Sequence, residues 1–521
     1  MRSQKVRPLH VVAVAGLLAA CSTGGQDTAN TTSATAIPTG SASASDGSSA
    51  TDDTDSGHDS STSGGSTGAE TSDTDASTSA SSESDATTAT DSDATTDGTD
   101  SDTGDMNPPN LDGLTLEETF EDGILNDWVR VERWRDSNEG FIQEDRFDLD
   151  QRAHQTGQRL DFFDGDPTPH SSVFLLHYAP GWDSAQKPVP ILLAHGANDQ
   201  ADRAWANPGE SGDFGCGTSP CPETGMMQAL AERGYAVFAV THPHSQGDNY
   251  FWSEQLYDAI QIIRDRTGAD AVDLVGWSKG VMSARMYASS LKQDWGTAYA
   301  GDVRRLVLIG GPNLGFDYLF RYGTGHNSGI YTDYGGKINS PGPHDELFVF
   351  GQWVDRIEYG IYKSAAGDNW RGQLQMLASW DDVYPLTASA DNGIITWPVG
   401  DSASTYYGEG EYKGLYARGK GIDYAVEQGS VIQPMIDAGI PASVETFLLC
   451  GDINLDDQEV MMKGIPNEIA GPSDGVVFID SCAAEDGIGN LGEAVILEDV
   501  NHLRLGWDAA AVDQLDAWLS K

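Results

Sequence analysis

The sequence is short of basic residues: its 521 residues include 30 Lys and Arg against 80 Asp and Glu, a formal net charge of −50. Proteins that bind nucleic acids through the phosphates need clustered Lys and Arg, so this class is excluded and no nucleic-acid partner is expected. No apolar run reaches the roughly 18–20 residues of a membrane-spanning helix, which excludes a transmembrane domain. The strong negative charge favours a soluble monomer, because like charges repel.

The shortage of basic residues is greatest near the start of the chain. No Lys or Arg occurs between Arg7 and Arg130, and residues 21–110 contain 17 acidic residues among Ser, Thr, Gly and Ala. Such a segment cannot bury enough apolar surface to offset the chain entropy lost on folding, so it is predicted to be a disordered tether. Residues 111–521, with 63 acidic and 27 basic residues and a net charge of −36, form the predicted folded domain.

The first 20 residues are predicted to be an export signal. Three basic residues within positions 2–7 precede the apolar stretch 11–18, and small residues follow it. The segment Leu-Ala-Ala-Cys, which ends at Cys21, resembles a bacterial lipobox; this implies cleavage before Cys21 and acylation of that residue. We therefore expect an exported lipoprotein of the cell envelope, held in the outer membrane or at the cell surface by its lipid anchor.

Cysteine is scarce: apart from Cys21, which is predicted to be acylated, the chain has four, at 216, 221, 450 and 482. An even number in an exported chain favours two disulfides, although four cysteines allow three pairings. Cys216 and Cys221 share one Gly- and Pro-rich loop, while Cys450 and Cys482 follow two predicted strands, so we predict the pairs 216–221 and 450–482. Zinc is the alternative, but no C-x-x-C pair or suitably spaced His supports it, and no metal is expected.

From about residue 170 short apolar runs alternate with longer amphipathic ones, which is typical of a mostly parallel sheet with helices on both faces. This pattern predicts strands at 172–179, 189–196, 235–242, 271–277, 303–311, 444–451 and 493–500, and helices at 226–233, 252–266, 281–291 and 508–520. Residues 315–435 do not fit the alternation and are predicted to be a cap-like insertion. Its aromatic residues, such as Phe316 and Trp380, are expected to line an apolar pocket.

The pattern G-x-S-x-G occurs three times, at Ser66, Ser278 and Ser473. In a sequence so rich in Gly and Ser the bare pattern has little value, because on the order of one match is expected by chance. A nucleophile elbow must follow a strand and begin a helix. Ser66 lies in the tether and Ser473 precedes a predicted strand, whereas Ser278 has a predicted strand before it and a helix after it. Ser278 is therefore the predicted nucleophile.

A serine hydroxyl needs a general base, and the base needs an acid that orients it. His502 is the His after Ser278 that stands at the end of a predicted strand, so it is the predicted base. Asp474 is the first choice for the acid, and Asp452, at the end of another strand, is the alternative. Asp452 also begins an EF-hand-like spacing, but the turn Gly and the terminal Glu of such a loop are missing, so calcium is not expected there.

The oxyanion of an acyl-transfer reaction is stabilised by backbone N–H groups. One donor should be Lys279, which follows the nucleophile. The other should lie in the loop LLAHGAND, where Ala197 is preferred over Asn198. His195 in this loop is expected to fix the loop and not to act as a second base.

The HG loop after a strand, the G-W-S-x-G elbow, the S-D-G-V-V loop and the N-H-L segment, in this order, resemble bacterial lipases and esterases of the α/β-hydrolase superfamily. The resemblance covers about 189–311 and 443–521. It implies the α/β-hydrolase fold and a carboxylic ester hydrolase without cofactor, which uses a Ser-Asp-His triad and an acyl-enzyme intermediate on small or lipid-like esters. A peptidase, an amidase or an acyltransferase shares this triad, and a non-catalytic surface-displayed binding module is the alternative from another class.

Overall fold

The computed structural model describes residues 108–144, 154–210, 221–317, 371–385, 406, 421–453 and 471–521. All of them belong to one compact unit, Thr99–Lys521. The predicted export signal, the acylated Cys21, the tether and Cys216 lie outside the described residues. Among the helices of the described part, none combines the length and the apolar character needed to cross a membrane.

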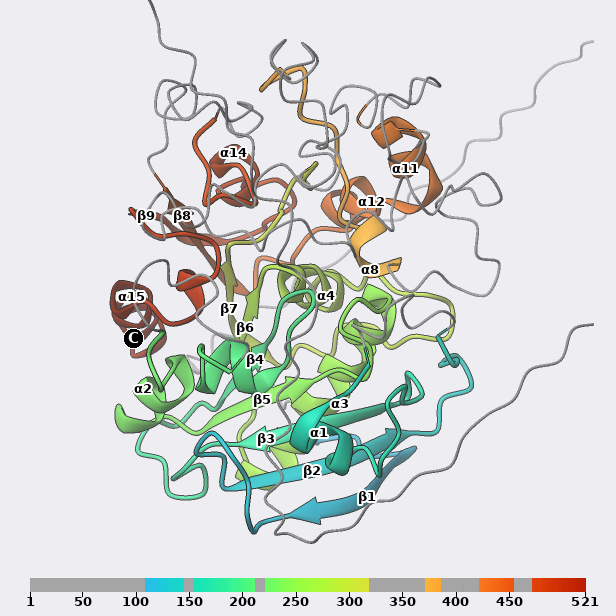
Figure 1. Cartoon of the computed structure of the whole chain (residues 1–521), viewed down its shortest axis with the longest axis vertical. Helices are drawn as coiled ribbons and strands as arrows, with labels where there is room; N and C mark the ends of the chain where they lie inside the picture. Colours follow the sequence, from blue (N-terminus) through green and yellow to red (C-terminus); the bar gives the residue numbers. More distant parts are fainter. Residues whose placement is uncertain are drawn as a thin grey trace, which may run out of the picture. The chain divides into compact units, whose positions relative to one another are not determined.

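The unit is built on a nine-stranded sheet in the order β1-β2-β3-β5-β4-β6-β7-β8-β9 (Figure 1). The strands from β4 to β9 pair in parallel, whereas β1, β2 and β3 are antiparallel to their neighbours. This order, with the exchange of β4 and β5, is that of the α/β-hydrolase fold, so the predicted fold class is confirmed. The strands are β1 (Leu114–Phe120), β2 (Arg130–Asp136), β3 (Val173–Tyr178), β4 (Ile191–Ala194), β5 (Val237–Thr241), β6 (Val272–Trp277), β7 (Val303–Ile309), β8 (Glu445–Asp452) and β9 (Leu491–Glu498).

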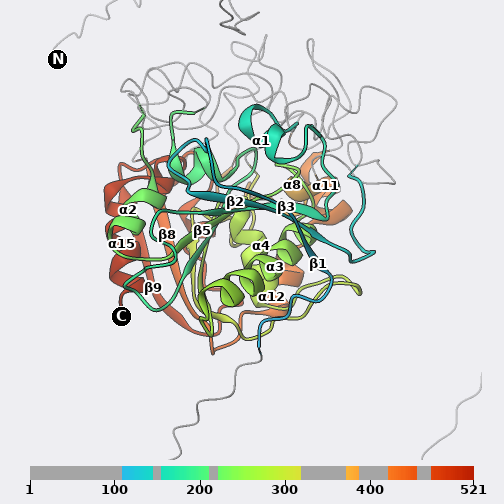
Figure 2. The ribbon, with the colours of Figure 1, turned by 90° about the horizontal axis from the view of Figure 1, so that it is seen from below.

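Helices cover both faces of the sheet (Figure 2). On one face lie α3 (Asn249–Thr267) and α4 (Lys279–Ala288), which share an apolar core with the strands. On the other face a π-helical turn, η1 (Asp202–Ala206), packs with α2 (Met226–Glu232) and α15 (Ala509–Leu519). The remaining elements are α1 (Gly157–Phe162), α8 (Arg371–Leu374), α11 (Gly421–Gly429), α12 (Ile432–Ala438), α14 (Ile479–Cys482) and the 3₁₀ turn η3 (Arg504–Gly506).

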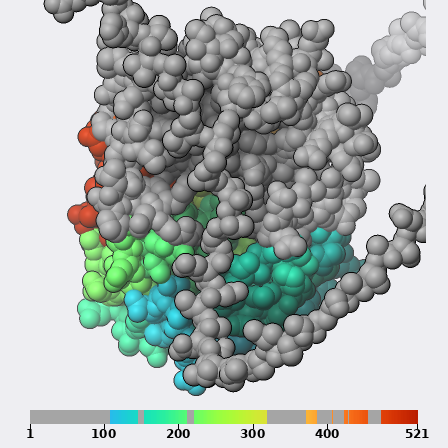
Figure 3. Space-filling view, in the orientation of Figure 1, coloured from blue at the N-terminus to red at the C-terminus, as the bar shows by residue number. Residues whose placement is uncertain are grey.

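The sequence pattern does not predict β1, β2 and α1, because β2 reads RVERWRD and lacks an apolar period. In the sheet the charges of β2 find partners. Arg133 donates to Glu117 of β1 at 3.0 Å, and the buried Glu132 accepts from Arg130 and from the hydroxyl of Tyr178, both at 2.5 Å. These two strands extend the sheet at one edge, and their part of the chain reaches the surface in blue (Figure 3).

The prediction of a strand after Ser473 is wrong. Ser473 and Phe478 form an isolated antiparallel bridge, and the short helix α14 follows. The carboxylate of Asp474 accepts hydrogen bonds from the N–H groups of Val476 at 2.9 Å and Val477 at 2.8 Å. Because the carboxylate binds these N–H groups locally, the chain turns and they are not available to a strand ladder.

Cys450 of β8 and Cys482 of α14 form a disulfide, with their Cα atoms 5.9 Å apart and 32 positions apart in the sequence. The loop that it closes contains Asp474. The side-chain amide of Asn313 donates to the carbonyl of Cys482 at 2.6 Å and ties the same region to the chain after β7. Cys221 is also disulfide-bonded, but Cys216 is not among the described residues, so the 216–221 pair stays a prediction.

Replacing both Cys450 and Cys482 by Ala should lower the free energy of unfolding by roughly 2–4 kcal/mol, because the unfolded chain regains the entropy of an open loop. Urea unfolding of the variant and of the wild type, each without reductant, measures this difference. Adding a reductant to the wild type should lower the free energy of unfolding at least as much, because it also reduces the disulfide of Cys221. Equal unfolding midpoints for the two proteins would contradict the expectation.

Candidate active site

Ser278 lies at a sharp turn between β6 and α4. Its backbone φ is +55°, in a region that residues with a side chain seldom occupy, and ψ is −122°. The N–H of Ser278 donates to the carbonyl of Ile309, at the end of the neighbouring strand β7, at 2.9 Å. The turn therefore holds the serine hydroxyl at the carboxyl edge of the parallel strands, as a nucleophile elbow does.

Close backbone contact explains the glycine that follows the elbow. A Cβ atom on Gly280 would lie only 2.4 Å from the carbonyl oxygen of Ala194 and 2.7 Å from that of His195. The first turn of α4 thus rests directly on the end of β4. A larger residue would push the elbow away from the loop that follows β4.

His502 and Asp474 complete a chain of hydrogen bonds to the serine. The Nε2 atom of His502 is 2.9 Å from Ser278 Oγ, and its Nδ1 atom is 2.7 Å from Asp474 Oδ2. The N–H of His502 also donates to the carbonyl of Asp474 at 2.9 Å. Both residues are buried, with 5% and 1% of their surface exposed. The structure therefore brings together the three side chains that the sequence singles out.

The rival acid, Asp452, is the last residue of β8. Its carbonyl oxygen accepts from the N–H of Val500 at 3.2 Å and so helps to start the loop that carries His502. A neutral imidazole carries one N–H hydrogen, which lies on Nδ1 when Nε2 accepts from the Ser278 hydroxyl, and Nδ1 faces Asp474. Asp474 is thus the carboxylate that is placed to orient His502.

The loop after β4 passes directly beside the nucleophile. A Cβ atom on Gly196 would be 2.9 Å from Ser278 Cβ. The N–H of Asn198 already donates to the carbonyl of Ser245 at 3.0 Å. Of the two candidate donors in this loop, Ala197 is therefore favoured.

His195 is engaged at both ring nitrogens. Its Nδ1 atom is 2.8 Å from the carbonyl oxygen of Gly196, and its Nε2 atom accepts from the N–H of His242 at 3.3 Å. Nδ1 must then carry the hydrogen and donate. Burial lowers the pKa of His195 to about 3, so the ring stays neutral and keeps this tautomer at physiological pH.

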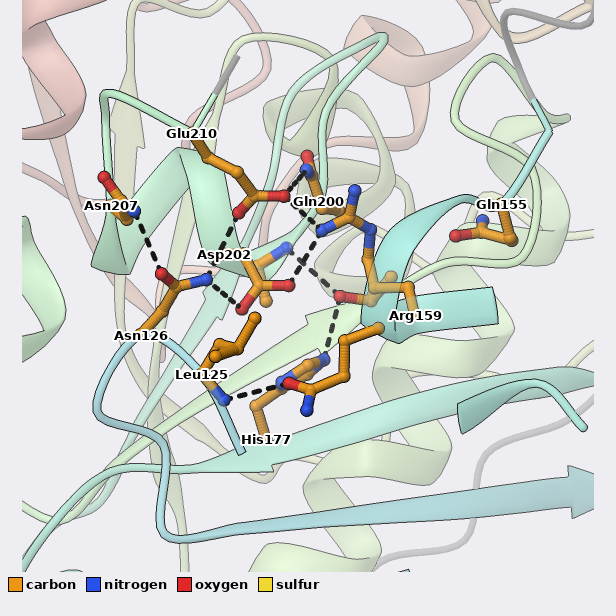
Figure 4. Close-up of polar contacts among 12 residues, drawn as sticks. Leu125, Asn126, Gln155, Arg159, His177, Gln200, Asp202, Asn207 and Glu210 are labelled. Atoms are coloured by element: carbon orange, nitrogen blue, oxygen red, sulfur yellow. Dashed lines mark hydrogen bonds and ion pairs between the residues drawn. The ribbon is translucent and has the colours of Figure 1, made fainter. Parts of the chain in front are cut away.

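Polar contacts fix the chain just beyond this loop (Figure 4). Arg159 of α1 lies between Asp202, at 3.0 Å, and Glu210, at 2.6 Å. Asp202 also accepts from the side chains of Asn126 and Trp128, each at 3.1 Å. Residues that precede β3 therefore hold the first residue of η1, a few positions after the candidate oxyanion loop.

The side chain of Lys279 is fully buried, which the sequence does not indicate. Its Nζ atom lies 2.9 Å from the ring centroid of Trp252. The imidazole of His242 stacks on the same indole at 3.9 Å and 12°, and two groups this close must occupy opposite faces of the ring. Burial lowers the pKa of Lys279 well below its usual value, although Glu144 and Asp248 raise it in part.

Glu144 is a second buried ionisable group near Lys279 that the sequence analysis does not identify. Its Oε1 atom accepts from the N–H of Asp248 at 2.9 Å. Burial raises the pKa of Glu144 to about 8. In the sequence Glu144 is one of many acidic residues ahead of the recognised motifs, and no spacing rule selects it.

The described aromatic residues of the insertion are packed among themselves and against the acid loop. Phe316 and Trp380 are 6% and 7% exposed. The rings of Trp380 and Tyr384 lie 5.9 and 4.2 Å from that of Phe478, four residues after Asp474. These rings brace the segment behind the candidate acid, and Trp370 and the other aromatic residues between 318 and 370 lie outside the described residues.

The comparisons with known proteins concern the fold. No family model and no curated protein matches the chain. Similar solved structures include the lipase BlEst2 of Bacillus licheniformis in its mature form (14% identity, 66% of this chain and 97% of that chain, TM-score 0.34). They also include a thermostable carboxyl esterase of Bacillus coagulans, with 14% identity over 67% of this chain and 93% of that chain and a TM-score of 0.30. A third is the esterase RhEst1 of a Rhodococcus species, with 14% identity over 67% of this chain and 95% of that chain and a TM-score of 0.29.

Glu144→Gln should change how stability depends on pH. The pKa of about 8 in the folded state exceeds the unfolded value of 4.5, so the folded state binds more protons between these values. The stability contributed by protonated Glu144 is full below about pH 4.5 and is lost as the pH rises through about 8. From pH 5 to pH 9 the wild type should lose at least about 1 kcal/mol more than the variant.

Urea unfolding at pH 5, 7 and 9 measures this difference. Glu223→Gln, at an exposed carboxyl group, is the matched control and should follow the wild type. Parallel curves for the wild type and Glu144→Gln would show that Glu144 is charged in the folded protein across this range.

Proposed function

We propose that this chain is a serine carboxylic ester hydrolase, similar in mechanism to lipases and esterases. The observation that carries the proposal is the hydrogen-bonded series Ser278–His502–Asp474, with 2.9 and 2.7 Å between the polar atoms. The three residues come from loops after β6, β8 and β9, which are far apart in the sequence. Such a series turns a weak hydroxyl nucleophile into one that attacks an acyl carbon.

In the first half of the reaction Ser278 Oγ attacks the ester carbonyl while His502 Nε2 accepts the hydroxyl proton. Asp474 accepts a hydrogen bond from Nδ1 and stabilises the imidazolium that forms. His502 then donates the proton to the leaving alcohol, which leaves an acyl group on Ser278. Water repeats the cycle, with His502 as its general base, and releases the acid. No step needs a cofactor.

Two backbone N–H groups, those of Lys279 and Ala197, stabilise the negative charge of the tetrahedral intermediate. Lys279 is the first residue of α4, where helical N–H groups lack acceptors in the preceding turn. The peptide between Gly196 and Ala197 is held by its carbonyl, which accepts from His195 Nδ1 at 2.8 Å. In a trans peptide the N–H points opposite to the C=O, so His195 orients the N–H of Ala197 away from its own ring.

The same proposal includes the cellular location. The basic, apolar and small residues that end at Cys21 support export and acylation. The enzyme would then act at the cell envelope as a monomer on a long acidic tether, on small or lipid-like esters.

Ser278→Ala should lower kcat for p-nitrophenyl butanoate by at least about 10⁴-fold, because the triad acts as a unit. Ser473→Ala removes the other matching serine of the folded domain and should retain activity within a few-fold. Steady-state hydrolysis of the ester measures both. A Ser278→Ala enzyme with most of its activity, and with an unchanged thermal unfolding midpoint, would refute the proposed function.

His195→Phe keeps an aromatic ring beside His242 and Trp252, whose rings lie 5.0 and 4.9 Å from that of His195, but removes both hydrogen bonds. Since a single oxyanion donor contributes about 10²–10³-fold to kcat, a misdirected donor at Ala197 should lower kcat by about 10²-fold and leave KM within about threefold. His195→Asn, whose amide can still donate to the carbonyl of Gly196, should recover part of the loss. An unchanged kcat in His195→Phe would show that His195 does not orient the donor.

A further inference from the structure

Four buried polar side chains lie around one glycine, Gly372 in α8. The N–H of Gly372 donates to the carbonyl of Gln246 at 3.1 Å, and its carbonyl accepts from Asn249 Nδ2 at 2.8 Å. A Cβ atom on Gly372 would lie 2.2 Å from Lys279 Cε and 2.8 Å from Lys279 Nζ. The neighbouring Gln373 donates from Nε2 to Gln246 Oε1. We call Gln246, Asn249, Lys279 and Gln373 the Gly372 cluster.

The cluster is both buried and incompletely hydrogen-bonded. Gln246, Asn249 and Lys279 are 0% exposed and Gln373 is 3% exposed. Within the described part of the chain, Gln246 Nε2, Asn249 Oδ1, Lys279 Nζ and Gln373 Oε1 have no hydrogen-bond partner. A buried polar group without a partner costs free energy, and four such atoms around one glycine point to a polar partner.

The unpartnered atoms comprise two donors and two acceptors. If the amides of Gln246 and Gln373 are both flipped, one of their free atoms is still a donor and the other an acceptor. A hydroxyl group matches such a set, because it donates one hydrogen bond and accepts others. An alkyl chain would leave all four atoms unpaired.

The charges near the cluster disfavour an anion. Lys279 carries the only cationic group of the cluster, and burial lowers its pKa well below the usual value. Burial raises the pKa of Glu144 to about 8. Burial thus works against the charged forms of both groups, which leaves little positive charge to hold a carboxylate or phosphate.

The cluster adjoins the nucleophile, because Lys279 follows Ser278 directly. The geometry points to a polar subsite: the Gly372 cluster binds a neutral, hydroxyl-bearing part of the ester substrate. This inference rests on the proposed function and narrows its substrate class. It also gives the insertion a role, since α8 supplies one of the hydrogen-bonding side chains and the glycine around which the others lie.

Two matched pairs of esters test the subsite. p-Nitrophenyl 3-hydroxybutanoate and p-nitrophenyl butanoate differ by one hydroxyl on the acyl side, while glycerol monobutanoate and propyl butanoate differ by hydroxyls on the alcohol side. The wild type should have a kcat/KM at least about tenfold higher for the hydroxylated member of one pair, because a site built to hydrogen-bond a hydroxyl discriminates against an analogue without it.

Gln373→Met should then reduce this preference, which is the ratio of kcat/KM for the hydroxylated ester to kcat/KM for the plain ester, by about fivefold or more. Gln246→Met is the second variant, in case the first unfolds. Gln433→Met, at an exposed glutamine of α12, is the matched control and should keep the full preference. Thermal unfolding shows whether each variant is folded.

A kcat/KM ratio near one for both pairs in the wild type would overturn the subsite, and the cluster would then hold ordered water only. An unchanged ratio in both folded Met variants would overturn it as well. Failure of the proposed function is distinguishable, because the wild type would then hydrolyse neither member of either pair, or Ser278→Ala would remain active.

Discussion

The candidate site depends on one close backbone contact, between the first turn of α4 and the end of β4. Gly280 approaches the carbonyls of Ala194 and His195 so closely that no Cβ atom fits between them. This contact places Ser278 and the loop after β4 side by side, since Gly196 then nearly touches the serine side chain. A nucleophile and a candidate oxyanion donor from different strands thus become neighbours without any side chain between them.

The other parts of the site are arranged around this contact by loops at the carboxyl edge of the parallel strands. The carboxylate of Asp474 performs two tasks, because one oxygen turns its own loop through Val476 and Val477 while the other faces His502. The disulfide between Cys450 and Cys482 closes the same loop on β8. The acid is therefore held by its own turn and by a covalent link.

The N-terminal strands and α1 contribute to the site from a distance. Arg159 and Asn126 bind Asp202, which begins the turn after the oxyanion loop (Figure 4). On the opposite side the α8 segment of the insertion contacts Lys279 and the chain at Gln246. Segments outside the alternating strand and helix pattern thus support both flanks of the elbow.

The sequence by itself determined the elements whose signal is local. Near-continuous apolar strands and amphipathic helices predict β3 to β9 and the helices α2, α3, α4 and α15 within a few residues. A strand covered on both faces of the sheet reads as a continuous apolar run, whereas a helix buried on one face has apolar residues at a period of 3.6. The strand before Ser278 and the helix after it distinguish this serine from two others with the same glycines. His502 follows from its place at the end of a strand.

Only the tertiary structure decided what depends on partners distant in sequence. The charged segment of β2 forms a strand because its side chains find partners: Arg133 donates to Glu117, and Glu132 accepts from Tyr178. The choice between Asp474 and Asp452 was open until one of them faced His502. The sequence does not indicate that the Lys279 side chain is buried, since a lysine is normally solvated. Its contacts are with Trp252 of α3 and Gly372 of α8. Burial and long-range pairing are properties of the assembled chain, and no local pattern encodes them.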